Sequence, residues 1–226
     1  MHRRTRPISL DSDVSSQHVV ELELPALGDG DPYRLAVDGS GSSLGRFGGF
    51  GAIDDSGRAT AGWFYCNKEL VNRYPALTAR PQVAEMHALR MGLRRYRNGD
   101  TVHAVVDSLE VAALMEWVLH QEPAGEYVRG YFPKAARELA SHARRLRLSV
   151  SLDPKPVKKR HVSDDPLMLR AHRLSVGMRA LLEVKAPFDD DARAWLEMFA
   201  LSSSRDVVVI KNQHKNRLAW LERWKA

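Results

Sequence analysis

The sequence has little cysteine and no long apolar run. Its 226 residues include one cysteine, Cys66, so no intrachain disulfide can form and a secreted, disulfide-stabilised scaffold is excluded. Nothing approaches 18 consecutive apolar residues, the length that a membrane-spanning helix needs. The first six residues include three arginines and are followed by a mainly polar segment, unlike the apolar core of a secretory signal. We therefore expect a cytoplasmic protein with no membrane partner.

The net charge is modest but unevenly distributed. Lysine and arginine number 34 and aspartate and glutamate 28, which gives +6; the hydrophobic fraction of 44% and the charged fraction of 27% are those of an ordinary globular protein. Between Arg129 and His161, however, ten lysines and arginines occur with two acids, a surplus of +8. The rest of the chain is therefore slightly acidic. Such a basic stretch fits a polyanionic partner, although charge runs also form solvated faces without one.

The hydrophobic pattern predicts an α/β fold. Short apolar segments separated by Gly, Ser and Asp turns indicate antiparallel strands, and later segments change to the 3.6-residue period of helices. We expect a mixed five-stranded sheet flanked by helices. Its predicted elements are strands over 33–37, 48–53, 61–66, 102–106 and 147–152, and helices over 83–96, 109–119, 133–146 and 166–182.

Three regions are predicted along the chain. Residues 1–30 are rich in Ser, Asp and Arg and are expected to be a flexible segment, within which 19–24 could form a short strand. Residues 31–184 form the main domain. Pro187 marks a boundary, and residues 188–226 are expected to be a small C-terminal helical extension, with a helix, a short strand at 207–210 and a final helix.

Three acidic residues occupy positions where the predicted elements begin or end. Asp38 ends the first strand of the main domain, Glu85 lies in the first turn of a helix, and Asp107 ends the fourth strand. Strand ends at one edge of a sheet converge, and a helix packed on the sheet can place a glutamate above them. Like charges brought together repel unless a cation neutralises them, and oxygen ligands favour Mg²⁺ or Mn²⁺. Each acid alone would be an ordinary turn or helix-start residue; together they predict a divalent-metal site.

The order of these motifs resembles type 1 ribonuclease H. Asp38-Gly39-Ser40 followed by Gly48–Ile53 is similar to the first hairpin of that family, and Ala84–Leu89 to its glutamate-bearing helix. Val106-Asp107-Ser108 is similar to its Asp-Ser strand end. The similarity covers residues 33–120, and the fold that it implies is a ribonuclease H-like catalytic domain over residues 31–184.

The resemblance also implies an activity. It is that of a metal-dependent endoribonuclease, which hydrolyses the RNA strand of RNA–DNA hybrids and leaves a 3′-hydroxyl and a 5′-phosphate. Asp38, Glu85 and Asp107 would hold two Mg²⁺ ions, with Mn²⁺ possible in their place. His161, in the basic loop before the last core helix, is similar in position to the family's mobile-loop histidine, which assists proton transfer or product departure.

One position departs from the family pattern. The family has a fourth carboxylate in the last core helix, where this chain has His172. A neutral imidazole can ligate a metal but adds no negative charge. His172 is therefore either a fourth ligand that biases the site toward Mn²⁺ or the mark of weakened activity. Asp164 or Asp165 could supply an oxygen instead, but both are better explained as the cap of that helix.

Nucleic-acid contacts are predicted on polar and basic residues. In the family, polar residues next to the metal ligands read the minor groove and the 2′-hydroxyls of RNA, although Pro81-Gln82 replaces the asparagine-rich segment usual there. Lysines and arginines of the basic stretch would bind phosphates. The predicted contacts are Ser40, Gln82, Ser108, Lys134, Arg144, Arg145, Lys158, Lys159 and Arg160.

Two other functions stay open from the sequence. A binding module could keep this fold and its basic surfaces while its catalysis is weakened. Alternatively, a nuclease of the same fold could act on a different nucleic acid. In each case we expect a monomer whose partner is an RNA–DNA hybrid or another nucleic acid.

Overall fold

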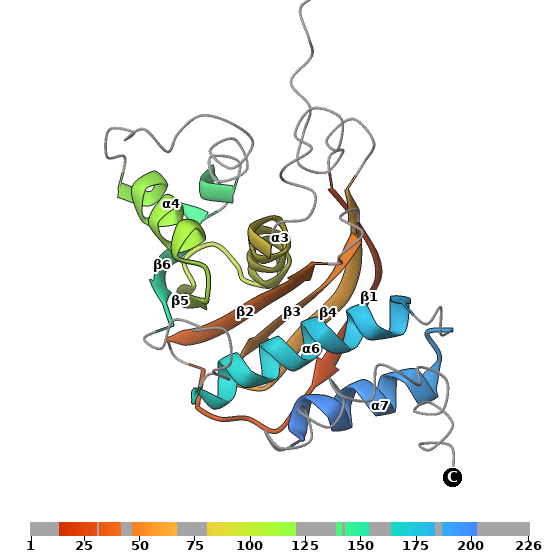
Figure 1. The fold of residues 1–226 in the computed structure, drawn as a ribbon. Coiled ribbons are helices and arrows are strands. Elements are labelled where there is room, and N and C mark those ends of the chain that lie inside the picture. The colour runs from red at the N-terminus through yellow and green to blue at the C-terminus, as the bar shows by residue number, and fades with distance from the viewer. Residues whose placement is uncertain are drawn as a thin grey trace, which may run out of the picture.

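The structure is a computed structural model, and it describes residues 14–30, 32–41, 47–66, 81–120, 139–141, 143–153, 164–183 and 187–202. These residues form a six-stranded mixed sheet with helices on both faces (Figure 1). The strands are β1 (Val14–Glu23), β2 (Tyr33–Gly41), β3 (Phe47–Asp54), β4 (Arg58–Cys66), β5 (Thr101–Val106) and β6 (Arg147–Leu152). The helices are α3 (Pro81–Leu93), α4 (Leu109–His120), α6 (Pro166–Glu183) and α7 (Asp190–Leu201).

The sheet has an antiparallel half and a parallel half. Its strand order is β1-β4-β3-β2-β5-β6, with antiparallel pairing from β1 to β2 and parallel pairing of β2 with β5 and of β5 with β6. Parallel neighbours need long crossovers. Helix α3 lies in the crossover that leads to β5, and α4 lies in the one that leads to β6. The predicted α/β class and mixed sheet are confirmed.

The sheet has one strand more than the five that the sequence predicted. Strand β1 pairs with β4 from Val14, opposite Cys66, to Glu23, opposite Arg58, with a bulge between Gln17 and Val20. The structure thus places residues 14–23 of the segment expected to be flexible in the sheet. The first half of β1 reads Val-Ser-Ser-Gln-His and lacks apolar alternation. This half of β1 forms a strand because it pairs with the edge of β4. A partner so distant in the sequence cannot be predicted from a local pattern.

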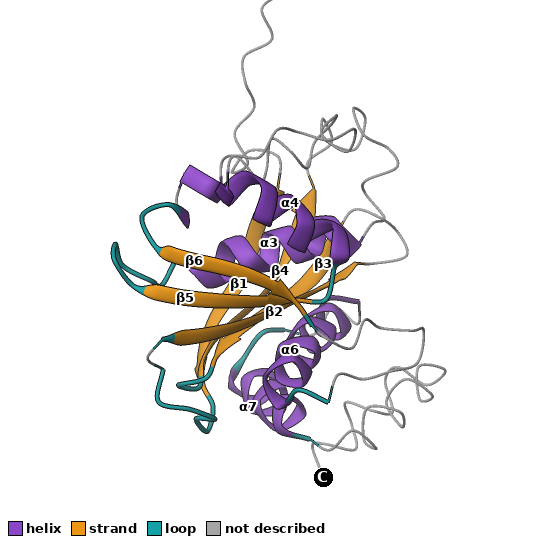
Figure 2. Ribbon diagram, turned by 90° about the vertical axis from the view of Figure 1, so that its left-hand side faces the viewer, coloured by secondary structure: helices purple, strands orange, loops and turns teal. Residues whose placement is uncertain are grey.

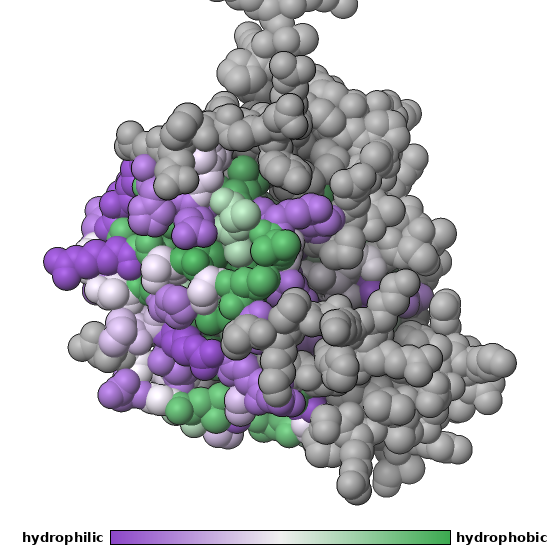
Figure 3. Space-filling model, turned by 60° about the vertical axis from the view of Figure 1, so that its left-hand side comes forward, coloured by the Kyte–Doolittle hydropathy of each residue, from purple (hydrophilic) through white to green (hydrophobic). Residues whose placement is uncertain are grey.

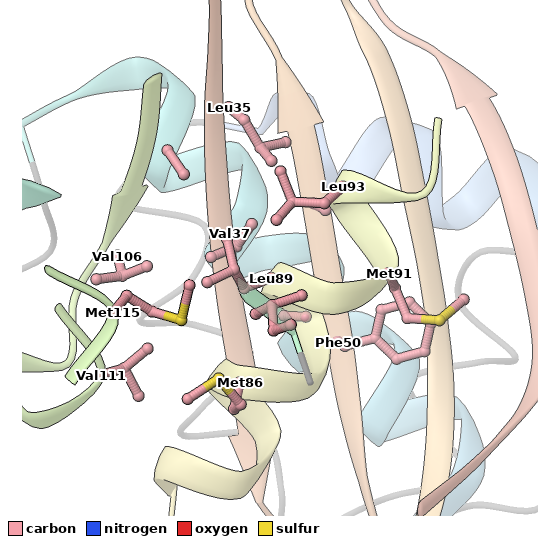
Figure 4. Packing of buried hydrophobic residues seen from close by; sticks show 14 of the residues in the cluster. Leu35, Val37, Phe50, Met86, Leu89, Met91, Leu93, Val106, Val111 and Met115 are labelled. Carbon is pink, nitrogen blue, oxygen red and sulfur yellow. The ribbon is translucent and has the colours of Figure 1, made fainter. Parts of the chain in front are cut away.

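Helices α3 and α4 cover one face of the sheet, and α6 and α7 cover the other (Figure 2). On the first face, buried side chains from strands β2, β3, β4 and β5 and from helices α3 and α4 pack together (Figure 4). Strands β2 and β3 lie in the middle of the sheet, and their apolar residues contribute to the cores on both of its faces. The residues of the first core that Figure 4 labels include Leu35, Val37, Phe50, Leu89 and Met115.

The second core joins α7 to the main domain. Trp195, Leu196 and Phe199 of α7 are buried in the cluster that contains Leu174 of α6. Asp189 caps α7, because its Oδ1 accepts a hydrogen bond from the backbone N–H of Ala192 at 3.0 Å. The first helix of the predicted C-terminal extension is therefore part of the same packed body. The strand and the final helix predicted after it lie outside the described residues.

No described helix is both long enough and apolar enough to cross a membrane. Figure 3 shows one face of the molecule, on which hydrophilic residues surround a hydrophobic patch. Apolar atoms form much of the surface of any folded domain, so this mixture is ordinary.

Candidate metal centre

Three carboxylates meet where β5 ends beside β2, and β2 itself continues to Gly41, so Asp38 lies within this strand and does not end it as the sequence predicted. Asp38 lies on β2, Glu85 on α3, and Asp107 directly follows β5. Each offers one oxygen, and these three oxygens lie within 4.8 Å of one another. Asp38 is 4% exposed and Glu85 1%, whereas Asp107 is half-buried. The structure thus brings together the three acids that the sequence predicted to gather, and the cluster could hold a metal ion.

Two backbone N–H groups hold Glu85 in this cluster. The N–H of Gly39 donates to Oε2 at 2.8 Å, and the N–H of Asp107 donates to Oε1 at 3.1 Å. These bonds join α3 to β2 and to the end of β5. The glutamate is therefore fixed by the backbone of both strands that bring the other two acids.

Helix α3 comes close to β2 because residue 39 is glycine. A Cβ at Gly39 would lie 2.5 Å from the Cβ of Ala84, and closer still to the Ala84 carbonyl carbon and the Glu85 nitrogen. The last two are backbone atoms, which no change of rotamer can move aside. Any larger residue would separate α3 from β2 and draw Glu85 away from the Gly39 N–H.

Helix α6 holds Asp38 from the opposite face of the sheet. Nδ1 of His172 lies 3.3 Å from Asp38 Oδ1, and the Ser175 hydroxyl donates to Asp38 Oδ2. Glycines on β3 permit this approach: a Cβ at Gly49 or at Gly51 would lie no more than 2.5 Å from a backbone carbonyl oxygen of α6. Glycines on two neighbouring strands thus allow helices on both faces to reach one site.

The charges of neighbouring groups separate the pKa values of the three acids. At Asp38, burial raises the pKa, but the charge and hydrogen bond of His172, the Ser175 hydroxyl and the charge of Arg179 outweigh it, so the pKa lies below its ordinary value. At Glu85, burial and the charges of Asp107 and Asp38 raise the pKa well above its ordinary value. Burial and the charge of Asp38 also raise the pKa of Asp107. The cluster therefore carries repulsion that a bound cation would relieve.

The donor set fits a hard divalent cation. All three groups offer carboxylate oxygens, which suit ions such as Mg²⁺ and Mn²⁺. Two of the carboxylates are buried, and buried like charges are stable together only when protonated or when paired with a cation. Asp38, Glu85 and Asp107 are accordingly the residues that would hold such an ion.

His172 lies beside the three-oxygen cluster and is not a member of it. Its side chain is 35% exposed and contacts Asp38. Asp165, the other alternative for a fourth carboxylate, caps α6: its Oδ1 accepts from the Leu167 N–H at 3.0 Å, and its carboxylate pairs with Arg34. The expectation that Asp165 is a helix cap is confirmed.

The predicted minor-groove residues lie next to the cluster in the chain. Ser40 follows Asp38 on β2 and is buried, and Gln82 is half-buried in the first turn of α3. Ser108 is half-buried at the start of α4, where its Oγ accepts from the Val111 N–H at 3.3 Å. Ser108 therefore also serves as a helix cap.

The predicted phosphate contacts Arg144 and Arg145 lie at the other end of the sheet. Both are exposed and precede β6, and the Arg145 carbonyl accepts from the Gly99 N–H at 2.8 Å. Because β5 and β6 run parallel and Asp107 follows the far end of β5, the strand length of about 20 Å separates these arginines from the cluster. The other predicted residues lie outside the described residues; they are Lys134, Lys158, Lys159, Arg160 and His161.

Three residues around the cluster were missed by the sequence reasoning. Ser175 and Arg179 follow His172 on one face of α6, and Nη1 of Arg179 donates to the Gly41 carbonyl at 3.0 Å. Asp153, at the end of β6, is buried, and after burial its charge is among the causes that raise the pKa of Asp107. The sequence spacing of His172, Ser175 and Arg179 places them on one face of a helix. Which strand this face contacts depends on tertiary packing, so their position next to Asp38 could not be predicted.

Asp107→Asn is expected to stabilise the metal-free protein. The substitution removes one of three clustered charges, and a gain of about 1 kcal/mol would raise the melting temperature by about 2–4 °C in a chain of this size. The pKa values of Glu85 and Asp107 are raised in the folded state. Their cost to stability is therefore absent below their ordinary pKa values and grows as the pH rises through the raised ones. The gain should be larger at pH 8 than at pH 5.

Thermal melts in EDTA at the two pH values measure this gain. Asp191→Asn, which removes an exposed acid of α7, is the control and should show no such pH-dependent gain. Added Mn²⁺ should raise the melting temperature of the parent and not that of Asp107→Asn. A lower melting temperature for Asp107→Asn at pH 8 would contradict the repulsion described above.

Comparison with known proteins does not place the chain in a family. A scan against protein-family models and a search of curated proteins both find no match. Fold and site together define an α/β protein with a six-stranded mixed sheet and a three-carboxylate cluster that could hold a metal ion.

Proposed function

We propose that the protein is a divalent-metal-dependent nuclease of the ribonuclease H type, which hydrolyses the RNA strand of RNA–DNA hybrids. The observation that carries this proposal is the cluster of Asp38, Glu85 and Asp107, whose oxygens lie within 4.8 Å of one another. The order of elements supports it, because three antiparallel strands are followed by a helix, a parallel strand and a further helix, as the resemblance implies.

Asp38, Glu85 and Asp107 would hold two Mg²⁺ or Mn²⁺ ions, which supply Lewis acidity and an activated water for phosphodiester hydrolysis. The task of the chain itself is to orient these ligands. Backbone N–H groups fix Glu85, and α6 fixes Asp38 through Ser175 and His172. Ligands held in place before substrate arrives need little rearrangement during the reaction. His161 is proposed to assist proton transfer or product departure.

The basic stretch would bind the phosphate backbone of the substrate. Arg144 and Arg145 precede β6, whereas the acids lie at the far end of β5, so the two places are separated by about the length of a six-residue strand, roughly 20 Å. A duplex that contacts both places must span this separation. Cleavage should weaken for hybrids too short to do so.

A cleavage assay on the full chain tests the proposal. A labelled RNA–DNA hybrid of about 20 base pairs is incubated with Mg²⁺, with Mn²⁺ or with EDTA, in parallel with double-stranded RNA and DNA. We expect metal-dependent cleavage of the RNA strand of the hybrid, with 5′-phosphate and 3′-hydroxyl ends. Salt-sensitive binding without product would favour a binding module instead. Preferential cleavage of another duplex would favour a nuclease of different substrate range.

A further inference from the structure

We propose that Ser175 is a positioning residue for the metal centre, because its hydroxyl fixes the Asp38 carboxylate in the orientation in which Asp38 binds a cation. The inference rests on the proposed metal site and adds to it a residue outside the three acids. Ser175 is fully buried in α6, on the sheet face opposite α3.

The Ser175 hydroxyl has two acceptors for its one proton. Its Oγ donates to Asp38 Oδ2 and lies 2.9 Å from the carbonyl oxygen of His172, three residues earlier in the same helix. A serine within a helix commonly bonds to such a carbonyl. A carboxylate is the stronger acceptor because a hydrogen bond to a charged group is roughly twice as strong as one between neutral groups. An ionised Asp38 therefore draws the hydroxyl toward the metal centre.

Each oxygen of Asp38 has a partner on α6, and the two partners differ in exposure to solvent. His172, on Oδ1, is partly exposed at a distance of 3.3 Å, whereas Ser175, on Oδ2, is buried. The terminal torsion of an aspartate has a broad energy profile, so an unrestrained carboxylate rotates easily. Without the Ser175 hydroxyl, only the partly exposed histidine would hold the group from this side.

Backbone packing sets the position of Ser175. Its carbonyl oxygen lies where a Cβ at Gly49 would stand, and its backbone nitrogen lies 2.9 Å from the position of a Cβ at Gly51. The helix thus rests directly on β3 at this point. The contact between α6 and β3 therefore holds the Ser175 hydroxyl next to Asp38. If this hydroxyl is removed, a rotamer change of a neighbouring side chain will not restore the hydrogen bond.

Ser175→Ala in the full chain tests the inference, with Mn²⁺ binding measured by calorimetry and by electron paramagnetic resonance. Changes in residues that orient metal ligands typically cost 10–100-fold in affinity, and we expect Mn²⁺ affinity to fall by about that factor. Alanine is a good helix former, so α6 should persist. Ser175→Cys, which keeps the size and a weaker donor, should give an intermediate affinity.

Ser56→Ala is the matched control. The Ser56 hydroxyl also donates to a buried aspartate, Asp54 Oδ1 at 2.6 Å, but it lies in the turn before β4, away from the cluster. It should lose similar stability in EDTA and keep the Mn²⁺ affinity of the parent. Parental affinity in both Ser175 variants, or an equal loss in Ser56→Ala, would overturn the inference. If the parent itself binds no Mn²⁺, the proposed metal site fails and not merely the role of Ser175.

Discussion

Replacing Asp38 with asparagine is expected to lower the rate of hybrid cleavage by at least about a thousandfold, a loss of about 4 kcal/mol of transition-state stabilisation. Asp38 is the acid of the cluster that its surroundings keep ionised: its pKa is lowered because His172, Ser175 and Arg179 together outweigh burial. An amide of the same shape offers one neutral oxygen and no charge to a cation. Binding of the hybrid should be retained or improved, since a negative charge near a polyanion has been removed.

Single-turnover cleavage of a labelled hybrid and a separate binding titration measure the two effects of Asp38→Asn. Asp191→Asn removes the same charge from an exposed position on α7 and should cut at the parental rate. A melting temperature for Asp38→Asn close to that of the parent shows that the fold is retained. If Asp38→Asn cuts as fast as the parent, the proposed mechanism is wrong.

Gly39→Ala is expected to damage both the fold and the site. The new Cβ would overlap the backbone of α3 at Ala84 and Glu85, and overpacking of this kind costs about 1–3 kcal/mol or more. Because α3 must move outward, the Gly39 N–H should lose its bond to Glu85. We therefore expect a fall in melting temperature of about 2–12 °C together with loss of Mn²⁺ binding.

Gly28→Ala separates crowding from a general effect of removing a glycine. A Cβ at Gly28 would lie 3.2 Å from the Cβ of Asp55, away from the metal centre, and a shift of a few tenths of an ångström would relieve this contact, whereas at Gly39 the overlap with the backbone is far closer. Urea unfolding and Mn²⁺ titration should show a small change in stability and parental metal affinity for this control. Parental stability and Mn²⁺ affinity in Gly39→Ala would show that α3 does not rest on β2 as described.

Much of the fold and the core of the site could be predicted from the sequence. Strands β2 to β5 and helix α3 follow from local apolar periodicity and from turns such as Asp54–Gly57. The gathering of Asp38, Glu85 and Asp107 was predicted from their positions in these elements, although Asp38 lies within β2 and not at its end, and Glu85 lies beyond the first turn of α3. The aromatic residues Trp63, Phe64 and Tyr96 in or beside these elements are buried in the core.

What could not be predicted depends on contacts between distant segments. The partner of β1 lies on β4, about 40 residues away, and the first part of β1 has no pattern of its own. The role of Ser175 depends on which strand α6 meets, which is set by Gly49 and Gly51. The sequence around a helical serine does not show whether its hydroxyl bonds to a metal ligand. A glycine in a strand allows a helix to pack closely, but the sequence does not show which helix does so.

The bulge in β1 also bears on how this protein behaves at high concentration. Among the described residues, β1 is the last strand on its side of the sheet and has no strand partner on the side away from β4, and such an edge can be a template for edge-to-edge aggregation. The register shifts between Gln17 and Val20, and His18 within it has a φ of 48°. A strand interrupted in this way offers only short stretches of regular backbone to a neighbouring molecule. The irregularity therefore protects the sheet against intermolecular strand addition.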